Sequence, residues 1–262
     1  MTTRIQLSTC PDSLKTLALA NYGHFTTMHV EGGRVKGLAL HVERLIQDSV
    51  ALFSVKINQE QIREIIKHSM AGLGDTGLLR ITLFSPAFEI GRPVAKPHEL
   101  VAHAIMRQLP EGTPPPPRVR TAVYDRERPE VKHVGLFGAL HHRRAAQLDG
   151  FDDALLVNVN GEVTEGTTWN IGFIDNERLI WPAGPALPGV TMRLLQEAHT
   201  RCEVVNVTRS DLGQFQAAFA TNSAYGVRPI GAIDSKKLDL RHPLLSTLRA
   251  TYEGIQGDRV TC

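Results

Sequence analysis

Apolar and polar positions alternate in three stretches of the first hundred residues, as they do in strands with one buried face. These stretches are residues 24–30, 78–84 and 100–106. Between the first two, apolar residues recur every three or four positions, which predicts amphipathic helices over 42–53 and 62–70. Asn58 is the expected N-cap of the second helix, with Gln61 in the capping-box position. This part of the chain is therefore expected to be α+β.

Four consecutive prolines at 114–117 interrupt this pattern. Such a run favours extended polyproline II geometry and continues neither a helix nor a central strand. We therefore expect an N-terminal domain over 1–109 and a C-terminal domain over 123–262. Residues 110–122 would be the connector together with the first strand of the second domain.

Beyond the prolines, short strand-like runs are separated by turns such as Asn160-Gly161, and helices are expected at 136–148 and 191–199. The predicted strands are 118–124, 154–158, 171–174, 178–181, 203–207 and 217–220. Many short strands joined by tight turns favour an α+β fold over a doubly wound sheet.

Composition narrows the function classes. Hydrophobic residues make up 42% and charged residues 21%, which is typical of a folded globular protein. The formal charge of +2 does not indicate a nucleic-acid binder, and we expect the basic segment 141–144 to be a solvated helix face. The sequence contains neither an apolar run of about 18 residues nor a secretory signal pattern, so we expect no membrane partner.

The cysteines and histidines suggest neither a disulfide framework nor a metal site. Cys10, Cys202 and Cys262 are too widely spaced for a zinc site and fit a reducing compartment, so a cytoplasmic location is expected. The histidines at 133, 141 and 142 lack the helical spacing that metal ligands use. We therefore expect no metal.

A series of short blocks changes the interpretation of two residues, Lys132 and Glu165, that would otherwise be assigned to the surface. The blocks are 23–28, 41–45, 131–133, 150–156, 161–171, 181–182, 187–193 and 221–230. Each block is weakly specific, but in this order over most of the chain they resemble the class IV pyridoxal-phosphate enzymes, also called fold type IV. That family includes branched-chain and D-amino-acid aminotransferases and aminodeoxychorismate lyase.

The resemblance implies an architecture as well as a cofactor. It implies a smaller N-terminal α/β sandwich domain and a larger C-terminal domain with a β-barrel-like sheet. Pyridoxal 5'-phosphate would lie in the cleft between the domains. It also implies a homodimer in which the partner supplies some residues of the substrate pocket.

The same resemblance assigns roles to individual residues. Lys132 would form a Schiff base with the cofactor and then move a proton as general base and acid. Glu165 would pair with the pyridine nitrogen and keep it protonated. Arg44 would bind the phosphate bidentately, together with Val190 and Thr191 at the start of a helix and with the Ser223 hydroxyl. The last block departs from the small residues usual in the family by carrying Asn222, Tyr225 and Arg228.

Three functions remain open. We expect an aminotransferase acting between an amino acid or amine and a 2-keto acid. One alternative is a lyase-type elimination that gives 4-aminobenzoate and pyruvate, because blocks 23–27, 41–45 and Lys132-His133 resemble both activities. The other alternative is a non-catalytic family member that binds a ligand. The expected walls of the substrate pocket are Tyr22, His24, Phe25, Thr27 and Trp169. The group that binds the substrate carboxylate is open among Arg80, Arg92, Arg126, Arg128 and Arg228.

Overall fold

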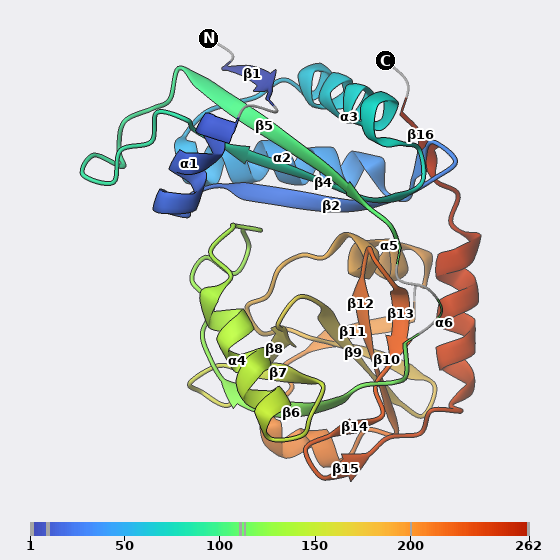
Figure 1. Ribbon diagram of the computed structural model, residues 1–262. Helices are drawn as coiled ribbons and strands as arrows, with labels where there is room; N and C mark the ends of the chain where they lie inside the picture. Colours follow the sequence, from blue (N-terminus) through green and yellow to red (C-terminus); the bar gives the residue numbers. More distant parts are fainter. Residues whose placement is uncertain (1–2, 9–10, 110–111, 113, 200, 261–262) are drawn as a thin grey trace. The chain divides into compact units, whose positions relative to one another are not determined.

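The computed structural model describes residues 3–8, 11–109, 112, 114–199 and 201–260 (Figure 1). They group into two compact units. The first comprises described residues within Met1–Pro110, Val131–Gly135 and Gln256–Cys262, and the second those within Glu111–Glu130 and Leu136–Ile255. The segment that carries Lys132 thus belongs to the first unit, whereas we had expected it in a C-terminal domain over 123–262. Cys10, Cys262 and three residues of the expected connector, 110, 111 and 113, lie outside the described residues.

The first unit contains a six-stranded sheet with the order β1-β5-β4-β2-β3-β16. Its strands are β1 (Arg4–Leu7), β2 (His24–Glu31), β3 (Arg34–Val35), β4 (Gly77–Phe84), β5 (Glu99–Arg107) and β16 (Asp258–Arg259). Its helices are α1 (Pro11–Ala20), α2 (Leu38–Phe53) and α3 (Gln59–Leu73). β1 pairs with β5 in parallel, and the other pairs are antiparallel.

Alternation along β2 decides which side chains enter the core of the first unit. His24, Thr26, Met28 and Val30 are all 0% exposed, as expected for every second residue of a strand covered on one face. The apolar members pack with Leu38, Val42 and Leu45 of α2 and with residues of α3 in one core. The same alternation buries two polar side chains, His24 and Thr26, at one end of the strand.

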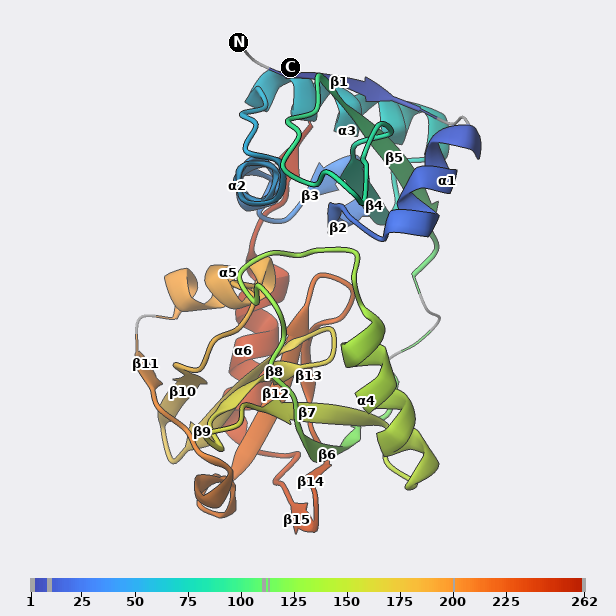
Figure 2. The same cartoon turned by 90° about the vertical axis from the view of Figure 1, so that its left-hand side faces the viewer.

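The second unit contains two five-stranded sheets, with the orders β11-β10-β9-β12-β13 and β15-β14-β6-β7-β8. The strands are β6 (Arg118–Val123), β7 (Asp153–Val157), β8 (Val163–Gly166), β9 (Asn170–Asp175), β10 (Arg178–Pro182), β11 (Cys202–Val205), β12 (Ala217–Asn222), β13 (Gly226–Pro229), β14 (Ala232–Ile233) and β15 (Lys236–Lys237). The α-helices are α4 (Phe137–Leu148), α5 (Val190–Ala198) and α6 (Pro243–Gly254). α4 lies beside β7, and α6 lies beside β13 (Figure 2).

Most predicted elements are present within a few residues of the expected bounds. Several other elements were not predicted, namely helices α1 and α6 and the strands β1, β3, β8, β13, β14, β15 and β16. The Asn58 side chain caps α3 by accepting the Glu60 N–H at 2.7 Å, as expected. The capping box is wrong, because Gln61 Oε1 is buried without a hydrogen-bond partner among the described residues. No helix in the described part of the chain is both long and apolar enough to cross a membrane.

Candidate active site

Lys132 lies in a short segment, Val131–Gly135, that runs beside β2. The Phe25 N–H donates to the Lys132 carbonyl at 2.9 Å, and the Val134 N–H donates to the Gly23 carbonyl at 2.9 Å. On the other side, the Lys132 N–H donates to Asp48 Oδ2 of α2 at 3.1 Å. The Lys132 Nζ lies 5.0 Å from the centre of the Phe25 ring. The main chain of this lysine is therefore fixed, and its amine lies over an aromatic face.

One face of α2 presents a polar stripe to this region. His41, Arg44 and Asp48 follow one another at spacings of three and four, which places them on one side of the helix. They are 1%, 8% and 4% exposed. The His41 Nδ1 shares a hydrogen bond of 2.6 Å with the hydroxyl of Thr26, one of the buried residues of β2.

Two histidines of this region, His24 and His41, are kept neutral at pH 7. Burial lowers the pKa of His24 to about 3. The pKa of His41 lies well below its usual value because the ring is buried and because the cations Arg44 and Lys132 are close. The neutral imidazoles do not alter the positive charge that Arg44 and Lys132 bring to this region. That positive charge favours an anionic ligand.

Glu165 lies in the second unit, on β8, and is 6% exposed. Its Oε1 accepts from Arg126 Nε at 2.8 Å, and its Oε2 accepts from the Leu187 N–H at 3.3 Å. Arg126 is itself buried, with 12% of its side chain exposed, and also donates to the carbonyl of Pro129. A buried carboxylate of this kind needs the compensation that a guanidinium and a backbone N–H provide.

The start of α5 leaves backbone N–H groups without a capping side chain. Gly189 is the N-cap residue and makes no side-chain cap, so Val190 and Thr191 are the first two helical residues and Thr191 is not the cap. A Cβ on Gly189 would lie 1.9 Å from Asn170 Oδ1, which explains the glycine. Thr191 is 1% exposed. Its hydroxyl oxygen is buried without a hydrogen-bond partner among the described residues. Burial raises the pKa of Tyr252, and the nearby Thr191 hydroxyl lowers it less strongly.

Ser223 lies in the turn between β12 and β13. Asn222 closes this turn, because its Oδ1 accepts the N–H groups of Ala224 and Tyr225, both at 3.0 Å. The neighbouring Thr221 Oγ1 is buried and has no hydrogen-bond partner among the described residues. The departure from small residues at Asn222 therefore has a local structural explanation.

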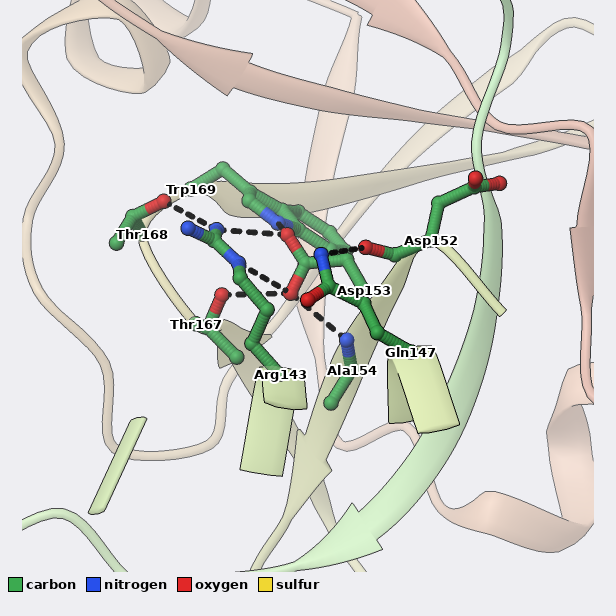
Figure 3. A network of polar contacts seen from close by, with 8 residues as sticks. All are labelled: Arg143, Gln147, Asp152, Asp153, Ala154, Thr167, Thr168 and Trp169. Atoms are coloured by element: carbon green, nitrogen blue, oxygen red, sulfur yellow. Dashed lines mark hydrogen bonds and ion pairs between the residues drawn. The ribbon is translucent and has the colours of Figure 1, made fainter. Parts of the chain in front are cut away.

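A hydrogen-bond network around Asp153 supports the turn that follows Glu165 (Figure 3). Asp153 accepts from Arg143 through Nε at 3.1 Å and Nη2 at 2.7 Å. It also accepts from the Thr167 hydroxyl at 2.6 Å and from Trp169 Nε1 at 2.9 Å. Arg143 is thus an exception to the solvated basic face predicted for 141–144, because a buried carboxylate lies within its reach.

A cavity of about 300 Å³ adjoins this network, and Trp169 forms part of its wall. The other lining residues are Pro117, Arg143, Gln147, Asp152, Asp153, Thr168, Ala220, Asn222, Tyr225 and Arg228. Trp169, which we expect in the substrate pocket, lines this cavity of the second unit.

The other predicted pocket residues lie in the first unit. His24 is fully buried, and its Nε2 shares a hydrogen bond of 2.9 Å with Ser49. The Tyr22 hydroxyl donates to the Leu52 carbonyl at 3.0 Å, and its ring stacks on Phe88. Thr27 is partly exposed. The first unit thus brings together these residues, Phe25, Arg44 and Lys132, whereas Glu165, Val190, Thr191 and Ser223 belong to the second.

Sequence reasoning missed three polar residues of these regions. Asp48 and His41 could have been found from their spacing to Arg44 on an amphipathic helix. Arg126 was considered only for the substrate carboxylate, but its guanidinium is bound to Glu165. Nothing local in the sequence indicates the contact of Arg126 with Glu165, because 39 residues separate the two.

Comparisons with known proteins show the family and the fold of the chain. Residues 23–233 match the family described as "Amino-transferase class IV". The "Probable branched-chain-amino-acid aminotransferase" of Rickettsia typhi is 28% identical over 225 residues, which are 77% of this chain and 75% of that protein. The protein of the same name from Aquifex aeolicus is 33% identical over 100 residues, 36% of this chain and 32% of its own.

Two solved structures share the fold over nearly the whole chain. The "Putative 4-amino-4-deoxychorismate lyase" of Legionella pneumophila superposes with a TM-score of 0.80 at 23% identity, covering 97% of this chain and 99% of its own. The branched-chain amino acid aminotransferase of Escherichia coli gives 0.81 at 15% identity, covering 98% and 94%. These similarities confirm the predicted two-part α+β architecture of fold type IV. The chain belongs to the class IV aminotransferases, a family of pyridoxal-phosphate-dependent enzymes.

Proposed function

We propose that this protein is an aminotransferase that transfers an amino group between an amino acid or amine and a 2-keto acid, with Lys132 as the attachment point of pyridoxal 5'-phosphate. The observation that carries the proposal is the fixed main chain of Lys132, with hydrogen bonds on both sides and Arg44 nearby. When bound, the cofactor withdraws electrons from the substrate Cα. Lys132 Nζ would take the proton from the substrate Cα and donate it on the cofactor side of the transferred nitrogen, so that the substrate leaves as a keto acid.

The chemistry of the donor set fits this cofactor. A phosphate dianion suits the buried guanidinium of Arg44 and the uncapped N-terminus of α5 at Val190 and Thr191. We propose that the Ser223 hydroxyl adds a further donor. The Oε2 of Glu165 would accept a hydrogen bond from the protonated pyridine nitrogen, while Arg126, which donates to Oε1, keeps the carboxylate oriented.

Arg80 is our candidate for the group that binds the substrate carboxylate. Its guanidinium carbon lies 3.6 Å from the centre of the Phe25 ring, the ring that also carries the amine of Lys132. Burial and the nearby Arg107 lower the pKa of Arg80, and none of the described carboxylates pairs with it. By contrast, Arg126 is held by Glu165. An anionic substrate group would therefore stabilise Arg80.

Reductive trapping tests the proposed attachment point. The purified protein incubated with pyridoxal phosphate should absorb visible light, and borohydride should leave the cofactor covalently on Lys132, located by peptide mass spectrometry. Lys132→Ala should abolish both signals, whereas Lys56→Ala, a change at an exposed lysine, should preserve them. Protein that stays colourless after reconstitution would overturn the assignment.

A lyase is the second candidate, favoured by the structural similarity to the Legionella protein. The two activities separate in an experiment with one amino donor and no keto acid. An aminotransferase releases at most one equivalent of keto acid until pyruvate or 2-oxoglutarate is added. Steady release of pyruvate from aminodeoxychorismate, with no reaction of any amino acid, would establish the lyase. Trapping without either turnover would identify a non-catalytic member.

We also propose that the protein is a homodimer whose partner subunit completes the substrate pocket, as the family resemblance implies. Light scattering coupled to size-exclusion chromatography should give twice the mass of the 28.9 kDa chain. A monomeric mass for the active enzyme would refute this part of the proposal.

A further inference from the structure

Asp48 contacts the proposed attachment lysine without a role in the chemistry described so far. It is 4% exposed and lies on α2. Its Oδ2 accepts the Lys132 N–H at 3.1 Å, while the Lys132 carbonyl accepts from Phe25 at 2.9 Å. The peptide groups before and after the Lys132 Cα are therefore both held, one by a side chain of α2 and the other by β2.

The strand geometry explains why a side chain is needed at this point. The Lys132 carbonyl and the Val134 N–H face β2, and His133 forms an antiparallel bridge with His24. In a regular antiparallel ladder the N–H and C=O of one residue face the same neighbouring strand, so the N–H of Lys132 would donate to the Phe25 carbonyl. The pairing of this segment with β2 is an isolated bridge, and the N–H of Lys132 leaves the ladder and donates to Asp48 instead. Asp48 thereby supplies the acceptor, and a charged acceptor makes a stronger hydrogen bond than a neutral carbonyl.

Arg44 lies four residues, or about one helical turn, before Asp48 on the same face of α2. A helix is a rigid spacer, so one element carries both the proposed phosphate ligand and the group that holds the lysine backbone. A further titratable group near Asp48 is His24, whose Nδ1 lies 4.0 Å from Asp48 Oδ2. Its Nε2 shares a hydrogen bond with Ser49.

We propose that Asp48 is a positioning residue that holds the backbone of Lys132 at a fixed spacing from Arg44, so that the amine and the guanidinium reach the same cofactor. The cofactor roles of Lys132 and Arg44 rest on the proposed function. The hydrogen bond between Asp48 and the lysine backbone does not, and it can be tested without cofactor.

The first test is amide hydrogen exchange in the cofactor-free full-length protein. In Asp48→Ala, the peptide that covers Val131–Gly135 should exchange about tenfold faster, because one charged hydrogen bond is lost. Asp48→Asn retains an acceptor oxygen, so its exchange should accelerate only about threefold. Gln47→Ala, at the exposed neighbour on the same helix, should leave this peptide unchanged.

The second test is the rate of borohydride trapping of pyridoxal phosphate on Lys132. We expect the trapping rate to fall from wild type to Asp48→Asn to Asp48→Ala, with about a tenfold lower rate in Asp48→Ala. Gln47→Ala should be trapped at the wild-type rate. Unchanged exchange at Val131–Gly135 in folded Asp48→Ala would overturn the proposal. Equal trapping by all folded variants would overturn it as well. If Asp48→Ala does not fold, unchanged exchange in Asp48→Asn has the same consequence. Wild-type protein that is not trapped at Lys132 refutes the proposed function instead.

Discussion

Replacing His24 with glutamine should remove a defined part of the acid sensitivity of the protein. Folded His24 has a pKa of about 3 against an ordinary value of 6.5, because the ring is fully buried. Between these two pH values the unfolded chain binds a proton that the folded chain does not, so lowering the pH favours unfolding. At pH 5, which is 1.5 units below the ordinary pKa, His24 lowers the free energy of unfolding by about 2 kcal/mol. This value follows from roughly 1.4 kcal/mol per pKa unit.

Urea unfolding at pH 8 and pH 5 measures this difference. Circular dichroism is the suitable signal, because both tryptophans, Trp169 and Trp181, lie in the second unit and do not report on the first. Between the two pH values the wild type should lose about 2 kcal/mol more stability than His24→Gln. His98→Gln, at an exposed histidine, should behave like the wild type. Equal pH dependence of the wild type and His24→Gln would refute the reasoning.

Three further changes act on the second unit. Glu165→Gln should retain the cofactor but lower turnover by orders of magnitude, and a normal kcat would contradict the assigned role. Urea unfolding should show that the free energy of unfolding falls by about 3 kcal/mol, because the charge of Arg126 loses its partner. Gly166→Ala should displace the Trp169 ring, because the new Cβ would lie 1.9 Å from it. The displaced ring should weaken the near-ultraviolet circular dichroism signal. An unchanged spectrum would argue against this packing. Asp153→Asn should lower the free energy of unfolding by about 1–2 kcal/mol, and the melting temperature with it. The effect is limited because the arginine partner of Asp153 is partly exposed. An unaltered melting temperature would show that the network is dispensable for stability.

The regular elements of the first unit were predictable because their periodicity is strong. From Thr26 onward β2 alternates between buried and less buried positions, and α2 carries apolar residues every three or four positions. α1 escaped prediction because a ten-residue helix with Leu19 82% exposed has little apolar periodicity. Short or partly exposed elements depend on tertiary packing, which a single sequence does not display.

The predicted site residues came from ordered blocks, whereas their supports could not be found in this way. Lys132 and Glu165 stand inside recognisable segments, but Asp48 contacts a residue 84 positions away. Whether a carboxylate on a helix faces a distant backbone N–H depends on how strands and helices pack. Arg143 shows the same limit, since its basic neighbours suggested solvent and only the fold brings it to Asp153.

The path of the chain between the two units constrains synthesis. β3 obtains its outer neighbour from β16, close to the C-terminus, and β2 obtains its bridge from Val131–Gly135. A ribosome that has released only residues 1–110 has therefore produced a sheet with two incomplete edges. Unpaired edges are templates for association with other chains. We expect a fragment ending at 110 to aggregate, and the first unit to mature only after the second has been translated.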